Sequence, residues 1–341
     1  MRARRIASAI FWALVAILIV APLGLWSATA LWFRLPAPDA VRAVAAGAAG
    51  LFALTTIVAL FSRVRRRALL MFALAFAVVL VWWSEIRPPL DGDWAPDVAR
   101  QTTGTVNGDI LTLSDVRDFD WRADDDFTET WETRSYDLKK LDALDLILAY
   151  WAGPEMAHLI MSFGFRDGQA LAWSIEVRRE KGGQYSPVAD AFRSHTLVSL
   201  ATTERDSVRL RSNVRGEDVR LYRLRASPQA MRTLLIGYVD EANALAHEPR
   251  WYNSITTNCT TAVTRTIRAL GGALPFDWRL IVNGYLPGYL YDRGAVDTSM
   301  PLAELTERAR INERAKAADQ SPDFSRLIRV GIPIPDGKPL M

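Results

Sequence analysis

The chain has 341 residues, of which 50% are hydrophobic, and its mean hydropathy is close to zero. Such an average is typical of a membrane part joined to a water-soluble part. The formal net charge is only +3, and arginines beside the apolar runs supply much of it, so composition does not support nucleic-acid binding. A single cysteine excludes an internal disulfide framework.

Three apolar runs near the N-terminus predict transmembrane helices at about residues 6–33, 41–62 and 68–85. The third run ends in the pair Trp82-Trp83, and tryptophan is enriched at the lipid–water interface. No small-residue cleavage site follows the first run, so we expect an anchor and not a removed signal peptide.

Basic residues predict the orientation of these helices. Arg2, Arg4 and Arg5 precede the first run, and Arg63 and residues 65–67 lie between the second and the third. The positive-inside rule assigns such clusters to the cytoplasm. Three crossings then leave the rest of the chain outside the cytoplasmic membrane.

We therefore expect three parts along the chain. Residues 1–86 form the membrane anchor, residues 87–100 a linker, and residues 101–341 one extracytoplasmic domain. The linker contains Arg87-Pro88-Pro89, which is stiff because proline restricts the backbone. The last part is long enough for a single domain with its own core.

The extracytoplasmic part combines strand and helix patterns. Short strands are predicted at residues 109–113, 158–165, 170–178, 198–201, 207–210 and 219–224, with Asp167-Gly168 as a hairpin turn. Residues 136–151 carry mixed signals, and we favour a helix over 138–146. Amphipathic periodicity predicts a helix at 228–246, and a further helix is expected near 302–316.

Cys259 stands at the start of another helical pattern, which continues through Val263 and Ile267 and ends at Gly271-Gly272. A helix N-terminus lowers the pKa of a thiol because free backbone N–H groups stabilise the thiolate. The residue can therefore serve as a nucleophile, although most free cysteines are small buried hydrophobes. Its local sequence leaves both interpretations open.

His158 opens the first strand of the hairpin. A histidine there is usually just a half-buried polar residue, but beside a helix-start cysteine it suggests catalysis in which the imidazole takes the thiol proton. A third group normally orients the ring. A three-residue turn would place Glu176 across from His158. A two-residue turn would bring Arg178 or Val177 nearer, and Ser174 is a further candidate.

Five strings carry a family resemblance. In order they are His158-Leu-Ile-Met-Ser-Phe-Gly-Phe, Ser174-Ile-Glu-Val-Arg-Arg-Glu-Lys, Glu204-Arg-Asp, Arg211-Ser-Asn-Val-Arg-Gly-Glu-Asp and the stretch from Tyr252-Asn to Asn258-Cys-Thr-Thr. Over about residues 111–286 they resemble the bacterial Lnb N-terminal periplasmic domain. The resemblance implies a circularly permuted papain-like (NlpC-like) domain with a small antiparallel sheet. Together with the three transmembrane helices predicted before it, we expect an α+β fold. It also implies Cys259 as nucleophile and His158 as base.

The resemblance implies a function as well, because the domain takes its name from a lipoprotein N-acyltransferase. Cys259 would take an acyl chain from a membrane phospholipid as a thioester, and an amine, such as the N-terminus of a lipoprotein, would accept it. The protein would then lie in the bacterial cytoplasmic (inner) membrane as a multi-pass protein with its soluble domain in the periplasm. A cysteine amidase or peptidase acting on cell-wall peptides is the alternative, as is a non-enzymatic envelope binding module.

Arg178, Arg179, Tyr252 and Asn258 are the candidate substrate-binding residues. The arginine fork suits a phosphate or carboxylate, although the charges around it equally fit a solvated cluster. Asn258 fits either a helix cap or an oxyanion-hole donor. We expect no metal or other cofactor, because one cysteine and three separated histidines lack zinc-ligand spacing. We also expect no nucleic-acid partner, since the arginines beside the apolar runs supply much of the net charge. Structural or non-catalytic roles are expected for Glu204-Arg205-Asp206, Arg211, His195 and His247.

Overall fold

The computed structural model describes residues 2–183, 186–253, 264 and 275–336. Cys259 and Asn258 lie outside the described residues. The chain divides into two compact units, the first made of Met1–Pro89 with Ser186–Ser194 and the second of Leu90–Tyr185 with His195–Met341. The expected linker, residues 87–100, is therefore shared between them, with residues from Leu90 onward in the second unit.

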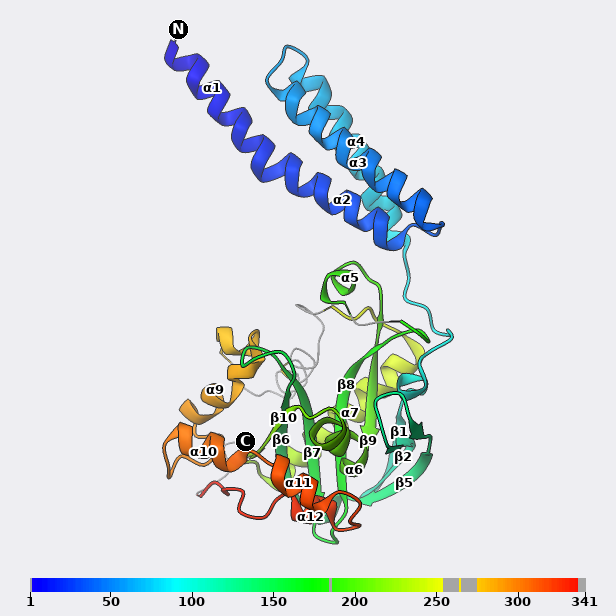
Figure 1. Ribbon diagram of the computed structural model, residues 1–341, viewed down its shortest axis with the longest axis vertical. Coiled ribbons are helices and arrows are strands. Elements are labelled where there is room, and N and C mark those ends of the chain that lie inside the picture. The colour runs from blue at the N-terminus through cyan, green and yellow to red at the C-terminus, as the bar shows by residue number, and fades with distance from the viewer. Residues whose placement is uncertain (1, 184–185, 254–263, 265–274, 337–341) are drawn as a thin grey trace. The chain divides into compact units, whose positions relative to one another are not determined.

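Three apolar helices make up most of the first unit (Figure 1). The first runs through α1 (Arg2–Val15), a π-helical turn at Ala16–Val20 and α2 (Ala21–Arg34). The others are α3 (Asp39–Leu60) and α4 (Arg65–Glu85). Each helix is long and apolar enough to cross a membrane, as predicted.

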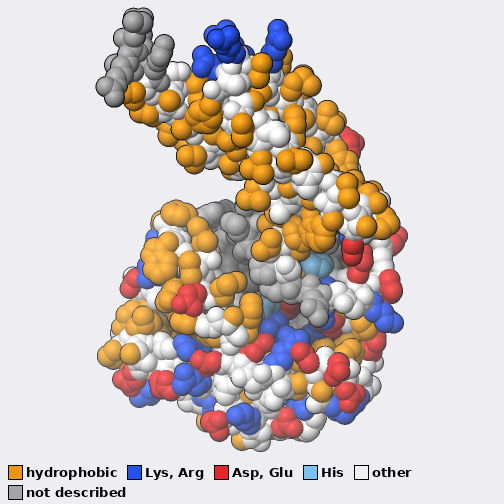
Figure 2. Space-filling view, turned by 45° about the horizontal axis from the view of Figure 1, so that its top comes forward, with side chains coloured by type: hydrophobic (Ala, Val, Ile, Leu, Met, Phe, Trp, Pro, Cys, Tyr) orange, Lys and Arg blue, Asp and Glu red, His pale blue; other side chains and the backbone are white. Residues whose placement is uncertain are grey.

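The surface of these helices is suited to lipid. Apolar side chains cover their outer faces, and basic side chains gather at one end (Figure 2). Inside, a Cβ added at Gly24 would lie 2.3 Å from the Cβ of Ala53. Helices without a hydrophobic driving force between them pack through such small residues, because the backbones can then approach closely. Substituting Gly24 would push the first and second apolar helices apart.

The segment Ser186–Ser194, which contains α5 (Pro187–Ala191), also belongs to the first unit. The ring of Phe192 stacks on Phe33 with centroids 5.7 Å apart. Arg193 donates to the carbonyl of Trp83 at 2.6 Å and lies 4.5 Å from the centre of the Trp83 ring. These contacts join the segment to the ends of α2 and α4.

The second unit is built on an eight-stranded sheet whose main path runs β1-β2-β9-β8-β7-β6-β10, with β5 paired to β2. Among the described strands its pairings are antiparallel except for one parallel bridge between Arg117 of β2 and Thr202 of β9. A separate two-stranded sheet joins β3 (Asp120–Trp121) to β4 (Phe127–Thr128). The strands of the large sheet are β1 (Thr103–Asn107), β2 (Ile110–Arg117), β5 (Trp131–Asp137), β6 (Leu141–Tyr150), β7 (Ala157–Phe165), β8 (Ala170–Arg178), β9 (Thr196–Thr202) and β10 (Asp218–Arg223).

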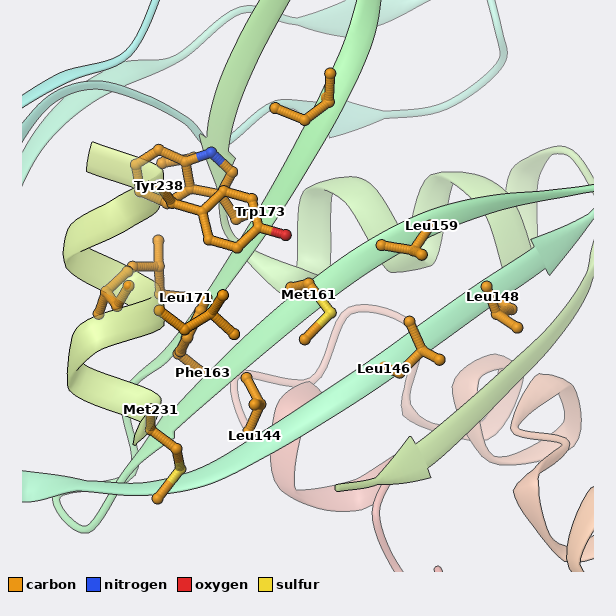
Figure 3. Packing of buried hydrophobic residues seen from close by; sticks show 14 of the residues in the cluster. Leu144, Leu146, Leu148, Leu159, Met161, Phe163, Leu171, Trp173, Met231 and Tyr238 are labelled. Carbon is orange, nitrogen blue, oxygen red and sulfur yellow. The ribbon is translucent and has the colours of Figure 1, made fainter. Parts of the chain in front are cut away.

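Helices cover both faces of this sheet. The apolar side of α7 (Pro228–His247) packs on one face, where Tyr238 meets Trp173 of β8 with ring centroids 5.6 Å apart (Figure 3). The other face packs against α6 (Glu204–Arg209), α11 (Asn312–Ala318) and α12 (Phe324–Leu327). Because side chains alternate along a strand, each strand supplies both cores.

Further short helices complete the second unit. They are α9 (Leu286–Asp292), α10 (Leu302–Ala309), 3-10 turns at Pro96–Val98, Leu138–Lys140, Trp278–Leu280 and Asn283–Tyr285, and a π turn at Leu210–Val214. The first of these turns is part of a packed segment, since Ala95 and Val98 are buried against Val198 and Leu200 of β9.

The α+β class is as predicted, but two element predictions are wrong and the sheet is larger than the small one expected. The predicted helix over 138–146 is mostly strand β6, which lies between two strands and is buried on both faces. A strand of this kind reads as a continuous apolar run, as a buried helix segment does. The predicted strand at 207–210 belongs to α6 and the π turn, since Thr203 Oγ1 accepts from the N–H of Asp206 and caps the helix.

The expected C-terminal helix over 302–316 is divided into α10 and α11. The break is at Arg310, which forms a bridge with Arg220 of β10, and Ile311, whose N–H donates to the carbonyl of Val219. The sheet edge thus takes the backbone groups that a continuous helix would have used.

Candidate functional site

The hairpin of β7 and β8 determines which residues face each other. Its turn has three residues, since the N–H of Phe165 donates to the carbonyl of Gln169, and Gly168 has a φ of +88° that favours glycine. The register pairs Ile160 with Ser174. Continuing the register by two residues brings His158 opposite Glu176, on the face of the sheet that packs against α6.

His158, Ser174 and Glu176 form one hydrogen-bonded group. Nε2 of His158 lies 2.7 Å from Oγ of Ser174 and 3.0 Å from Oε1 of Glu176. The Ser174 hydroxyl donates to the same Glu176 oxygen at 2.7 Å. The side chains of His158 and Glu176 are 12% and 22% exposed, so solvent competes little for these bonds.

Counting hydrogens identifies the tautomer of His158. The hydroxyl of Ser174 uses its one hydrogen on Glu176, and a carboxylate can only accept. Without a hydrogen, Nε2 would face two acceptor oxygens at close range. Nε2 therefore carries the proton, and Nδ1 keeps the lone pair of the neutral ring.

The electrostatic environment agrees with this assignment. Burial lowers the pKa of His158 by disfavouring the charged ring, Arg211 lowers it further, and Glu176 only partly offsets both. Burial alone would raise the pKa of Glu176, but His158, Arg211 and Ser174 together hold that pKa well below its usual range. Near neutral pH, both directions favour a neutral imidazole beside a charged carboxylate.

Arg211 and Glu217 extend the group. Nη2 of Arg211 donates to Oε1 of Glu176 at 3.2 Å, and Nη1 donates to Glu217 at 3.4 Å. Arg211 lies on the π turn Leu210–Val214, directly after α6. We expected a structural ion pair here; Arg211 does form ion pairs, and one of them is with Glu176, the candidate third catalytic residue.

A cavity of about 520 Å³ opens beside this group. Its charged lining is balanced in sign, because Asp124, Glu176 and Glu217 accompany three arginines. Such a lining does not by itself favour a small anion. The lining residues are Asp124, Trp151, Met156, Ala157, His158, Ile175, Glu176, Val177, Arg179, Gly183, Arg211, Arg215, Glu217, Tyr252, Ile281 and Asn283.

The structure describes three of the four candidate substrate-binding residues, and two of them line the cavity. Tyr252 lines the cavity and is buried, and its N–H donates to the carbonyl of His195. Arg179 also lines the cavity, but it pairs with Asp97 at 2.8 Å. Arg178 donates to the carbonyls of residues 98 and 99 and lies 4.7 Å from the centre of the Trp94 ring. The two arginines thus hold the N-terminal segment of the unit.

Sequence reasoning missed Asn283. Its side-chain amide donates to the carbonyl of Ala157 at 2.7 Å and accepts from the N–H of the same residue at 2.9 Å. These two bonds hold the start of β7 next to His158. The partners are 126 positions apart, and no local pattern joins them.

Behind the site, a buried ionic network holds α6 to the sheet. Glu204 accepts from Ser162 of β7 at 2.5 Å and from Arg329 at 2.5 and 2.7 Å, while Arg329 also donates to Asp145 of β6. Burial raises the pKa of Glu204, but Arg329 and the serine donors lower it below its usual value. The structural role predicted for Glu204 is confirmed by these contacts.

Comparison with known proteins agrees with the motifs. No curated protein and no solved structure matched the chain. A family model, the Lnb N-terminal periplasmic domain, matches residues 127–284. The matched range includes β5 to β10, α6 and α7, and therefore the His158–Glu176 hairpin and Arg211. Residues 127–284 thus belong to the family of the Lnb N-terminal periplasmic domain, and the chain is a membrane-anchored protein that carries it.

Proposed function

We propose that the protein is a membrane-anchored extracytoplasmic cysteine acyltransferase, in which Cys259 is the nucleophile and His158 the general base. The observation that carries the proposal is the hydrogen-bonded group of His158, Ser174 and Glu176 beside the cavity. Glu176 and Ser174 hold Nε2–H at the wall of a cavity, so Nδ1 keeps the lone pair that accepts the thiol proton in this proposal. A base oriented by a carboxylate is what a thiol nucleophile requires.

In the proposed reaction, Nδ1 of His158 takes the thiol proton as the sulfur of Cys259 attacks the ester carbonyl of a phospholipid. The C–O bond to the glycerol breaks, and the imidazolium returns the proton to the departing lysophospholipid. An amine then attacks the thioester, losing a proton to His158, and the C–S bond breaks. The amide leaves and the thiol is restored.

Glu176 stabilises the imidazolium that forms in both steps, because its low pKa keeps it charged beside Nε2–H. We propose a lipoprotein N-terminus as the amine because the matched domain is named after an enzyme that acylates it. The three apolar helices and the arginines between the second and third favour a multi-pass protein of the inner membrane with the domain in the periplasm.

Intact-mass measurement of the full chain purified from membranes tests the proposal. Because the chain has one cysteine, a fatty-acyl mass increment that hydroxylamine removes identifies a Cys259 thioester. We expect the adduct in the parent and in His247→Gln, a matched control on the exposed end of α7. Cys259→Ser should lack it, and His158→Gln should form it at least about 100-fold more slowly.

Other outcomes point to other functions. Absence of the adduct, together with cleavage of cell-wall peptides that depends on Cys259, would replace the transferase with an amidase or peptidase. Absence of both activities in a folded parent would leave a binding module. An adduct that persists in Cys259→Ser would refute covalent catalysis by this residue.

A further inference from the structure

We infer that Arg211 is a positioning residue, which holds Glu176 against His158 and is itself held by Glu217. The inference rests on the proposed function, in which the His158–Glu176 pair is the base. It assigns a role in the reaction to a residue that a sequence interpretation treats as an ordinary ion pair.

The place of Arg211 in the fold supports this role. A π turn shifts the direction of the following side chains relative to an α-helix, and such turns are frequent at functional sites. The turn Leu210–Val214 directs Arg211 to the face of β8 that carries Glu176. The side chains of Arg211 and Glu217 are only 9% and 8% exposed.

The contact made by Arg211 differs from a structural ion pair in one respect. Its guanidinium donates to Oε1 of Glu176, the oxygen that also accepts from Ser174 and from Nε2 of His158. Arg329, in contrast, joins β6 to α6 behind the cavity. Movement of Arg211 would therefore displace the acceptor that orients the imidazole.

Arg211 and Glu217 have opposite electrostatic effects on the protonation of the His158 ring. Nη2 of Arg211 lies within roughly 6 Å of Nε2 of His158, because each atom is about 3 Å from the same Glu176 oxygen. The arginine disfavours the imidazolium and Glu217 favours it. The charged groups that line the cavity around the ring are Asp124, Glu176, Arg179, Arg211, Arg215 and Glu217.

Histidine NMR on the full chain in detergent micelles tests the inference without substrate. Arg211→Gln should raise the pKa of His158 by on the order of one unit, and Glu217→Gln should lower it. Arg211→Lys keeps the charge and should leave the pKa near the parent value, while losing the fork and slowing acylation of Cys259. Arg308→Gln, which removes an exposed arginine paired with Glu304, is the control and should change neither.

Shifts of the same sign in Arg211→Gln and Glu217→Gln, or no shift in either folded variant, would overturn the inference. If Arg211→Gln is unfolded at room temperature, the sign of the His158 pKa shift in Glu217→Gln tests the inference. The titration is independent of acyl transfer, so failure of the parent to form an adduct would refute the proposed function and leave this result standing. An adduct in the parent without the opposite shifts would refute the role of Arg211 alone.

Discussion

Replacing Asp206 with alanine should destabilise the second unit strongly. The Asp206 carboxylate is fully buried and accepts from Nε and Nη2 of Arg117 at 2.8 Å each. It also accepts from the N–H of Phe119 and the indole of Trp121 at 2.9 Å each. Asp206 lies on α6, which leads directly into the turn that carries Arg211.

The expected loss of stability follows from the groups that the substitution leaves without a partner. Arg117 is 5% exposed, so removing its partner leaves a buried, uncompensated charge, at a cost of about 3–5 kcal/mol. The unpaired indole N–H of Trp121 adds about 1 kcal/mol or more. In a domain of this size, each kcal/mol of lost stability lowers the melting temperature by roughly 2–4 °C, so the melting temperature should fall by about 10–20 °C.

Thermal melts of the full chain in detergent, monitored through resistance to proteolysis, measure this loss of stability. Asp323→Ala, which breaks an exposed pair with Arg326, is the control and should melt like the parent. Arg117→Met combined with Asp206→Leu should regain much of the lost stability, because both charges are then removed. A shift in Asp206→Ala no larger than in the control, or a double variant as unstable as the single one, would refute the reasoning.

Three further predictions concern pH, packing and topology. The pKa of His158 in the folded chain lies below the ordinary value of 6.5, so the unfolded chain takes up a proton first as the pH falls. The free energy of unfolding should therefore decrease as the pH drops below about 6.5. In melts at pH 5 to 8, His158→Gln should show a weaker pH dependence than the control His247→Gln. Gly284→Ala would place a Cβ 2.0 Å from the carbonyl oxygen of Pro154, so we expect a loss of about 1–3 kcal/mol, whereas Gly50→Ala, with open space around it, should melt like the parent. Alkaline phosphatase fused after Asp93 should be active, and an inactive fusion with an active cytoplasmic reporter at the same site would reverse the proposed topology.

Local sequence patterns determined several features that the structure contains. Long apolar runs indicate the three apolar helices because such helices need about 20 residues of uninterrupted apolar character. The Asp167-Gly168 pair marks the β7–β8 turn, but the sequence left the turn length open, and the three-residue turn of the structure places Glu176 opposite His158. Periodicity identified α7 because it buries a single side. All of these signals arise within a few turns or one hairpin.

Tertiary structure decided the rest. Residues 141–150 form a strand because neighbours on both edges and helices on both faces take up their backbone and side chains, and none of these partners is visible in the run itself. Arg211 reaches Glu176 from 35 positions away, and only the π turn after α6 gives it that direction. Arg178 and Arg179 contact the N-terminal segment, about 80 positions earlier, because it offers them carbonyls and the carboxylate of Asp97. The types of side chain at the site can therefore be read from the local sequence, but contacts between distant segments determine which side chains interact.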